Sequence, residues 1–312
     1  MHYTYTRNRE ISKLTLGTVQ LGMAYGIANK KGKPAESESF NILQTAIEGG
    51  VNSLDTSLHY GDAETVIGNY LLSSQNNLQN LILTTKFKIT PEKDLSKKDV
   101  ERQIYDFVGH SLERLNIKKI PVYMLHNPED MTLYGDVVPN TLNKLKKEGL
   151  IGMAAVSVYS SEEVKEMLKN DIYEAIQIPM NIFDNRLIKS GYLKQLHATD
   201  KVVFVRSIFL QGLFFMDPAF LTGNLKNARE PLLKLAGLAE KEGMSIQQLA
   251  LSAIRDMEGV SSLVIGAETP EQVQENIMLM EGPSISEQTA YEISSLFDSI
   301  PVHILNPGMW RK

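Results

Sequence analysis

Short apolar segments alternate with longer amphipathic ones along most of the chain, and this alternation limits the possible folds more than any other feature. Eight apolar segments have the composition of buried strands, and they are Leu14–Leu16, Val51–Asp55, Leu81–Lys86, Val122–His126, Met153–Ser157, Ala175–Ile178, Val202–Arg206 and Leu263–Gly266. Segments between them have apolar residues at helical spacing, and they include Ser39–Gly50, Val100–Leu115, Val137–Gly149, Ser161–Leu168, Ala228–Gly243 and Pro270–Met280. Because strands separated by helices pair in parallel, the pattern predicts a closed (β/α)8 barrel, with an open doubly wound sheet as the alternative.

Two segments lie outside the eight predicted units. The N-terminal residues Tyr3–Ile11 are expected to form a hairpin that closes the bottom of the barrel. The C-terminal residues Pro283–Lys312 are expected to hold an extra helix, Ser286–Phe297, and a tail from Pro301 that forms a loop. Since no Gly, Ser or Pro-rich linker divides the chain and no repeat is visible, residues 1–312 are expected to form a single domain.

Composition excludes several classes of function. The formal net charge is -5 and basic residues do not cluster, so the sequence gives no support for binding to nucleic acid. The absence of cysteine excludes disulfides, thiolate metal sites and cysteine nucleophiles. No apolar run approaches the roughly 20 residues that span a bilayer, and the polar N-terminus lacks a signal core. We therefore expect a cytoplasmic protein that does not bind membranes.

Ionisable side chains follow three neighbouring strands of the predicted barrel. Asp55 ends the second strand and Tyr60 comes shortly after it, while Lys86 ends the third strand and His126 the fourth. Active sites of such barrels form at the carboxyl ends of the strands. The four side chains are therefore expected to meet at one rim.

These four residue types suit the reduction of a carbonyl group without a metal ion. Hydride addition leaves an alkoxide that must receive a proton as it forms. Tyr60, with an ordinary pKa of about 10, can donate that proton if the cation of Lys86 lowers its pKa. Asp55 would neutralise and orient the buried lysine, and His126 would donate to the carbonyl oxygen.

Two other chemistries remain open at this rim. Lys86 is also a candidate Schiff-base nucleophile of a barrel lyase. A metal-dependent hydrolase is disfavoured, because the first strand carries no His-x-His pair and His126 stands alone.

The segment from Asp55 to Gly68, which reads DTSLHYGDAETVIG, resembles the signature of the aldo-keto reductase family. Leu16-Gly17-Thr18, Thr85-Lys86 and Leu125-His126-Asn127-Pro128 are similar to further motifs of that family, and the resemblance extends from about Leu14 to about Asn276. It implies a reductase that uses NAD(P)H on a small-molecule aldehyde or ketone, with Asp55, Tyr60, Lys86 and His126 as the catalytic residues. Some members are cofactor-binding regulatory proteins, a third possibility that intact Tyr60 and Lys86 disfavour.

The resemblance also implies residues that hold the nicotinamide and the pyrophosphate. Ser157 and Gln177 match groups that bind the carboxamide, but Val158 replaces the usual asparagine. Arg206 takes a position where relatives often stack an aromatic ring, and it could stack there, reach an anionic group of the substrate, or form a salt bridge at the rim. The remaining residues implied in this half of the site are Gly17, Thr18, Ser207, Leu210 and Gly212.

Residues Ile265–Asn276 resemble the family's adenosine clamp. Asn276 is expected to contact adenine, and the helix that starts at Pro270 to offer N–H groups to phosphate. Where many relatives have Lys or Arg, this chain has Gly266, Glu268 and Gln272. The family default is NADPH, but the carboxylate of Glu268 would repel a 2′-phosphate and could accept a hydrogen bond from a free ribose hydroxyl. We therefore hypothesise a weakened preference for NADPH and use of NADH.

Two phrases, Gly17–Gly22 and Arg206–Gly212, are similar to a bacterial branch of the family found among surface-sugar and nucleotide-sugar pathways. This likeness implies a substrate with a sugar-like carbonyl. The substrate pocket is expected to be shaped by Ala24–Pro34, Met131–Asp136, Phe214–Asn227 and the C-terminal tail, none of which defines a substrate. The oligomeric state has no sequence signature either.

Overall fold

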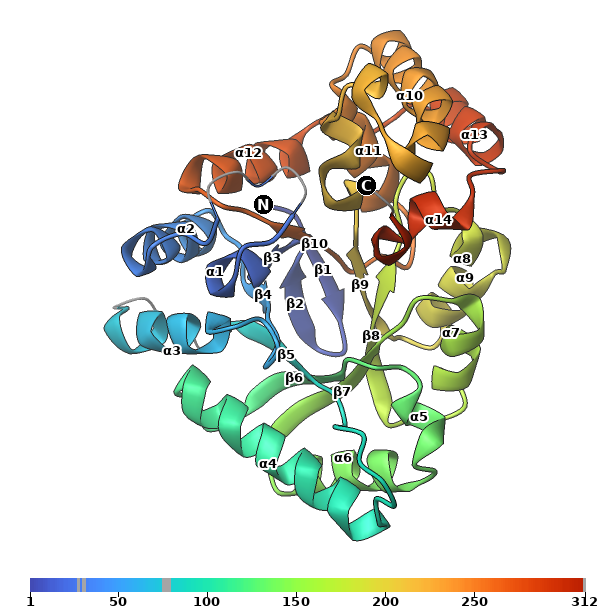
Figure 1. The fold of residues 1–312 in the computed structure, drawn as a ribbon. Coiled ribbons are helices and arrows are strands. Elements are labelled where there is room, and N and C mark those ends of the chain that lie inside the picture. Colours follow the sequence, from blue (N-terminus) through green and yellow to red (C-terminus); the bar gives the residue numbers. More distant parts are fainter. Residues whose placement is uncertain (27–28, 30–31, 75–79, 311–312) are drawn as a thin grey trace.

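In the computed structural model, which describes residues 1–26, 29, 32–74 and 80–310, eight parallel strands form a closed barrel that Figure 1 shows end-on. The barrel strands are β3 (Leu14–Gly17), β4 (Ser53–Asp55), β5 (Ile82–Phe87), β6 (Ile120–Leu125), β7 (Ile151–Ser157), β8 (Tyr173–Pro179), β9 (Val202–Arg206) and β10 (Ser262–Gly266). Strand β10 pairs with β3, which closes the ring. The predicted (β/α)8 barrel is confirmed, and the open-sheet alternative is wrong.

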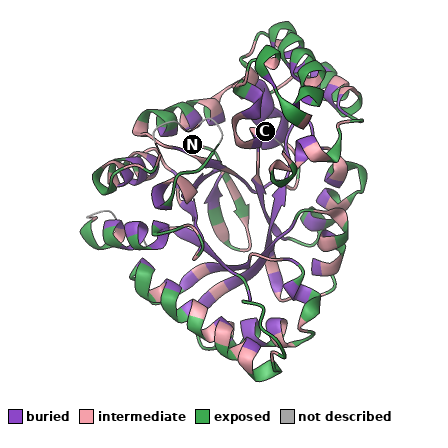
Figure 2. Cartoon of the chain, viewed as in Figure 1, coloured by how far each residue is buried: buried purple, intermediate pink, exposed green. Residues whose placement is uncertain are grey.

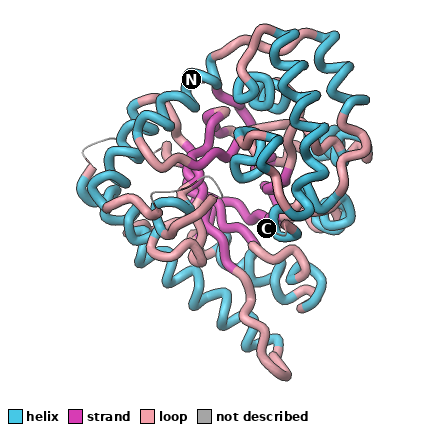
Figure 3. The backbone as a smooth tube through the Cα atoms, turned by 45° about the horizontal axis from the view of Figure 1, so that its top comes forward, coloured by secondary structure: helices cyan, strands magenta, loops and turns pink. Residues whose placement is uncertain are grey.

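Helices surround the barrel on the outside, as the tilted view in Figure 3 shows. They are α1 (Val19–Gly22), α2 (Glu36–Glu48), α3 (Ala63–Ser73), α4 (Lys97–Leu115), α5 (Asp130–Leu133), α6 (Val137–Lys147), α7 (Ser161–Met167), α8 (Arg186–Lys189), α9 (Tyr192–Ala198), α10 (Arg229–Glu242), α11 (Ile246–Arg255), α12 (Pro270–Glu281), α13 (Glu287–Leu296) and α14 (Val302–Leu305). Short 3-10 turns are η1 (Leu210–Phe215), η2 (Pro218–Phe220), η3 (Gly223–Ala228) and η4 (Pro307–Met309). None of the described helices is long and apolar enough to cross a membrane.

Most residues of the barrel strands are buried, as the purple strands in Figure 2 show. Alternate side chains of each strand point inward or outward. The inward set forms a compact interior core together with Ile11 of the N-terminal segment, and its strand residues are Ile82, Val122, Met124, Met153, Ala155, Ala175, Val202 and Phe204. The outward set packs against the helices in a larger core. Since the interior is filled with side chains, the barrel leaves its chemistry to the rims.

An antiparallel hairpin closes the end of the barrel where the strands begin. Strand β1 (Tyr3–Thr6) pairs with β2 (Arg9–Ser12). Asn52, just before β4, donates to the carbonyl oxygen of Glu10 at 2.8 Å, and Thr4 donates to the carbonyl oxygen of Ser261 just before β10. The side chain of Ile11 is fully buried in the interior core. The predicted hairpin at the barrel bottom is confirmed.

The C-terminal segment contains the predicted extra helix, which is α13. The tail, however, was predicted as a loop, and that prediction was wrong because α14 forms within it. Ile304 is fully buried against the cluster of side chains beneath α10 and α13, and its carbonyl oxygen accepts a hydrogen bond from Trp310 Nε1 at 3.1 Å. Tertiary packing therefore fixes a helix that is too short to be stable alone.

Candidate active site

A cavity of about 790 Å³ opens at the rim where the barrel strands end. Every strand brings a residue to this rim, and these residues are Gly17, Asp55, Lys86, His126, Ser157, Gln177, Arg206 and Gly266. All the predicted site residues line the cavity except Lys86 and Leu210, whose side chains are fully buried. The sequence therefore predicted which residues lie at this rim. The arrangement of their side chains determines the possible chemistry.

Lys86 lies at the centre of a group of polar atoms beneath the cavity. Its Nζ donates to Asp55 Oδ2 at 2.6 Å and to the carbonyl oxygen of Thr56 at 2.9 Å. A longer contact of 3.4 Å joins Nζ to Tyr60 Oη. Three of the four residues predicted at strand ends are thus linked directly through one ammonium group.

Burial controls the acidity of this group. It lowers the pKa of Lys86, but the Asp55 carboxylate and the Tyr60 hydroxyl raise that pKa by more, so the ammonium form is favoured. Burial also raises the pKa of Tyr60, and the cation of Lys86 opposes this rise without overcoming it. The expectation that Lys86 brings the pKa of Tyr60 below its ordinary value is not met, because the effects of burial and of Asp55 together exceed that of the lysine.

His126 faces the ring of Tyr60 edge-on, with ring centroids 6.0 Å apart. Burial, with the positive charges of Lys86 and of other neighbours, lowers the pKa of His126 to about 3. The imidazole is therefore neutral near neutral pH. Its Nδ1 lies 3.4 Å from Ser57 Oγ, which leaves Nε2 available toward the cavity.

Ser157 and Gln177, predicted to hold a nicotinamide carboxamide, both line the cavity. Gln177 also forms a hydrogen bond that the sequence did not indicate. Its Nε2 donates to Asp55 Oδ1 at 2.8 Å. Asp55 is thus held by Lys86 through one oxygen and by Gln177 through the other. One carboxylate connects strands β4, β5 and β8.

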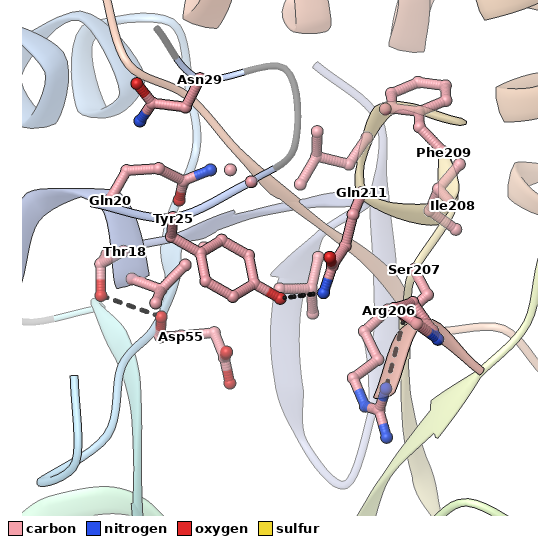
Figure 4. Close-up of a pocket in the computed structure, with 18 of the residues that line it drawn as sticks. Thr18, Gln20, Tyr25, Asn29, Asp55, Arg206, Ser207, Ile208, Phe209 and Gln211 are labelled. Atoms are coloured by element: carbon pink, nitrogen blue, oxygen red, sulfur yellow. Dashed lines mark hydrogen bonds between the residues drawn. The ribbon is translucent and has the colours of Figure 1, made fainter. Parts of the chain in front are cut away.

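Arg206, at the end of β9, extends over the ring of Tyr159, with 4.4 Å between the guanidinium carbon and the ring centroid. One amino nitrogen donates to the carbonyl oxygen of Val158 at 3.2 Å. The other donates to Ser207 Oγ at 3.4 Å, as drawn in Figure 4. Among the described residues, no carboxylate forms an ion pair with Arg206. The salt-bridged alternative for this arginine is therefore not observed.

The segment predicted to wrap a pyrophosphate turns sharply along the cavity wall. Leu210, Gln211 and Gly212 have φ values of 46°, 53° and 93°, so three successive residues are in the left-handed region. Ser207, Gln211 and Gly212 line the cavity, whereas Leu210 points into the protein core. A contact of Leu210 with a cofactor would have to come from its backbone.

Glu268, Gln272 and Asn276 line the other end of the cavity with Gly266. The side chain of Gln272 folds back, and its Oε1 accepts a hydrogen bond from the backbone N–H of Glu268 at 2.7 Å. Thr269 caps α12 and occupies the backbone N–H of Gln272. Fewer N–H groups are free for a phosphate at this helix start than the sequence suggested.

The cavity fits a dinucleotide in two respects. Its volume is within the range of roughly 300–1,000 Å³ typical of ligand pockets. The amide oxygen of Gln20, buried at the wall, has no hydrogen-bond partner among the described residues. Gln20 packs over Gly266, where an added Cβ would lie only 2.4 Å from the Gln20 amide nitrogen. A buried amide oxygen without a hydrogen-bond partner, next to a glycine that leaves room on the cavity wall, is typical of a surface that a polar ligand covers.

Several lining residues were not predicted individually. Tyr25 and Gln211 approach from opposite walls and are joined by a hydrogen bond of 2.9 Å from Gln211 Nε2 to Tyr25 Oη, shown in Figure 4. Tyr159, Phe209, Phe215, Gln247 and the tail residues Asn306, Pro307 and Gly308 also line the cavity. The lining by Tyr25 and by the tail residues agrees with the expectation that loop Ala24–Pro34 and the C-terminal tail shape the pocket. Residues 27, 28, 30 and 31 of that loop lie outside the described residues. Segment Met131–Asp136 contributes no described residue to the lining.

The sequence of this chain was compared with family models and with known proteins. Residues 13–297 match the model of the "Aldo/keto reductase family". The NADH-specific methylglyoxal reductase of Escherichia coli is 27% identical, over 87% of this chain and 90% of the relative. An uncharacterised oxidoreductase of Bacillus subtilis, YqkF, is 25% identical over 93% and 94% of the two chains.

Solved structures show the same architecture. An aldo-keto reductase from Bacillus halodurans, determined in its holo form, superposes with a TM-score of 0.76 at 22% identity, covering 95% of this chain and 96% of that one. A glycerol dehydrogenase from Gluconobacter oxydans gives a TM-score of 0.75 at 22% identity over 96% and 97% of the two chains. At this level of identity, the likeness establishes the barrel fold.

Proposed function

The chain belongs to the aldo/keto reductase family and is an oxidoreductase, and from this premise we propose that it reduces an aldehyde or ketone to an alcohol with Tyr60 as the proton donor. The observation that carries the proposal is the buried contact of Lys86 with both Asp55 and Tyr60, beneath a cavity that His126 also lines. We propose further that residues 1–312 act as one domain.

The proton moves from Tyr60 Oη to the oxygen of the substrate. The raised pKa of Tyr60 keeps the phenol protonated at neutral pH, so the acid is present when it is needed. As the proton leaves, the ammonium of Lys86 stabilises the developing phenolate, and Asp55 keeps that ammonium charged. A reduced nicotinamide supplies the hydride when bound. Neutral His126 orients the carbonyl oxygen by donating a hydrogen bond from Nε2.

The lyase alternative for Lys86 is disfavoured by the same contacts. A Schiff-base nucleophile must be a neutral, accessible amine. Lys86 has no exposed surface, is paired with Asp55, and has a raised pKa.

The test is the variant Tyr60→Phe, assayed by the absorbance of the reduced nicotinamide with a panel of aldehydes that includes methylglyoxal, the substrate in the name of the Escherichia coli relative. We expect kcat to fall about 10²–10⁴-fold while cofactor binding is retained. Tyr291→Phe, at a position 73% exposed on α13, is the matched control and is expected to leave kcat unchanged. Full activity in Tyr60→Phe would refute the assignment of the proton donor.

We also propose that NADH serves as the cofactor, with the carboxylate of Glu268 accepting a hydrogen bond from the free ribose 2′-hydroxyl. The described residues that line the cavity include no lysine, and their one arginine, Arg206, is stacked on Tyr159. Glu275 lines the cavity together with Glu268 and adds a second carboxylate. The NADH specificity in the name of the Escherichia coli relative supports the same choice.

Measured kcat/KM with each cofactor tests this proposal. We expect NADH to be preferred, and Glu268→Arg to move the preference toward NADPH by about 10-fold or more, since a cation replaces an anion beside the phosphate. Glu271→Arg makes the same change of charge on α12 outside the cavity lining and is expected to leave the ratio near its original value. A preference of the unaltered enzyme for NADPH of about 100-fold would contradict the proposal.

A further inference from the structure

Arg206 is the one lysine or arginine among the described residues that line the cavity. It lines the same cavity as Tyr60, His126 and Tyr159, and its positive charge opposes the rise in the pKa of Tyr60 and helps to lower the pKa of His126. The arginine therefore faces the end of the cavity where the carbonyl group must bind.

The charges at this end do not cancel without a ligand. The ammonium of Lys86 is compensated by the carboxylate of Asp55 at 2.6 Å, and His126 is neutral. Burial and the nearby Lys88 lower the pKa of His59, which keeps that ring neutral as well. Among the described residues that line the cavity, Arg206 is therefore the one cation, and no carboxylate of the described residues forms an ion pair with it.

The guanidinium group also keeps unused hydrogen-bonding capacity. An arginine has five N–H donors, and two of them bond to Val158 O and Ser207 Oγ. No described residue accepts a hydrogen bond from the other three. The ring of Tyr159 supports one face of the group, so its plane is fixed before any ligand arrives.

We propose that Arg206 binds a carboxylate on the substrate, so that the enzyme prefers aldehydes or ketones that carry this group. A planar fork of N–H donors matches the two oxygens of a carboxylate. The one cation of the described cavity lining balances the single charge of a carboxylate, whereas a phosphate monoester brings nearly two negative charges. The inference deepens the proposed reductase function and depends on it, since it names the class of carbonyl compound that is reduced.

The experiment compares carboxybenzaldehyde with carbamoylbenzaldehyde, which has nearly the same shape but no charge. For the unaltered enzyme with NADH, we expect kcat/KM to favour the carboxylate by about 10- to 100-fold, as charge-assisted hydrogen bonds would give. Arg206→Gln should remove this preference through a higher KM for the carboxylate, with kcat/KM for the amide nearly unchanged. Arg206→Lys should keep part of the preference. Arg102→Gln, on α4 with its side chain 68% exposed, is the control for loss of one positive charge.

A binding measurement separates this inference from the proposed function. Carboxybenzyl alcohol should bind the unaltered protein in calorimetry, in the presence of NAD⁺, at least about 10-fold more tightly than it binds Arg206→Gln. If that difference appears while no aldehyde is reduced, the carboxylate site stands and the reductase proposal fails. If both aldehydes are reduced equally well by the unaltered enzyme, the inference is overturned although the reductase function stands.

The cofactor is the other source of negative charge, and the same variant tests it. If Arg206→Gln lowers kcat/KM equally for both aldehydes and weakens NADH binding, measured by quenching of protein fluorescence, Arg206 serves the cofactor. That result would overturn the inference.

Discussion

At the scale of single residues, His126 has a pKa far below its ordinary value. Its pKa of about 3, caused first by burial and then by the charge of Lys86, keeps the imidazole neutral through the physiological range. An unfolded histidine titrates near pH 6.5. Between these two values the unfolded chain binds the additional proton, so the contribution of His126 to stability is complete above about pH 6.5 and is lost as the pH falls toward 3.

The lowered pKa of His126 and the raised pKa of Tyr60 predict how activity depends on pH. For carbonyl reduction by the unaltered enzyme, we expect kcat/KM to have no inflection near pH 6.5, because His126 does not titrate there. Activity should persist to alkaline pH, since Tyr60 keeps its proton above its ordinary pKa of about 10. The measurement is kcat/KM between about pH 5 and 9.

His59→Asn is the control for this profile, because His59 is the other histidine beside His126, with ring centroids 6.2 Å apart. An inflection near pH 6.5 that survives in His59→Asn but disappears in His126→Asn would contradict the neutral imidazole.

The candidate catalytic residues could be predicted because each follows an apolar strand, and parallel strands bring their carboxyl ends to one rim. The partners of these residues were not predictable. The hydrogen bond from Gln177 to Asp55 joins positions 122 apart in sequence. The raised pKa of Tyr60 depends on the enclosure of its ring, which a sequence does not display.

At the scale of elements, the strands were predictable because they are continuous apolar runs. The helices that were not predicted individually are α1, α3, α5, α8, α9, α11 and α14. Helix α11 has an amphipathic pattern, but it is only ten residues long and is buried along nearly its whole length, from Gln248 to Arg255. Helix α3 follows the loop of Tyr60 directly and is likewise buried on several sides. Helix α14 has only four residues and depends on the burial of Ile304. Sequence periodicity most readily identifies long helices with one buried and one exposed face, whereas these three helices are short or are buried on several sides.

The loop that carries Tyr60 is held against α1 by a close approach at Gly22. An added Cβ at this position would lie 1.7 Å from the carbonyl oxygen of Tyr60 and 2.6 Å from the backbone nitrogen of Ala63. The variant Gly22→Ala must therefore displace the loop. We expect a loss of about 1–3 kcal/mol in the free energy of unfolding and a fall in kcat approaching about 10²-fold. Urea unfolding and steady-state kinetics measure the two effects.

Gly237→Ala is the matched control for this change. Gly237 lies in α10, where an added Cβ would meet no atom within 4 Å. An alanine there should stabilise the helix by up to about 1 kcal/mol and leave kcat unchanged. Normal kcat in Gly22→Ala would show that the loop absorbs the clash without moving Tyr60.

At the scale of the whole molecule, the two ends of the barrel have separate tasks. The end where the strands begin is covered by the hairpin β1–β2, whose Ile11 completes the interior core. The end where the strands finish carries the cavity with Tyr60 and Arg206. In barrels of this kind, the residues at the first end mainly determine the stability of the fold, whereas those at the second end determine the chemistry.

This separation predicts that a defect at the hairpin lowers stability without changing the reaction. Ile11→Ala removes a fully buried side chain from the interior core and should reduce the free energy of unfolding by about 2–5 kcal/mol. Tyr5→Ala, in the same hairpin but 74% exposed, should cost far less. At a temperature where both variants remain folded, kcat and the preference between aldehydes should equal those of the unaltered enzyme, because the interior core separates the hairpin from Tyr60. A fall in kcat for folded Ile11→Ala would mean that the packed core transmits strain from one rim to the other, and the two ends would then not be independent.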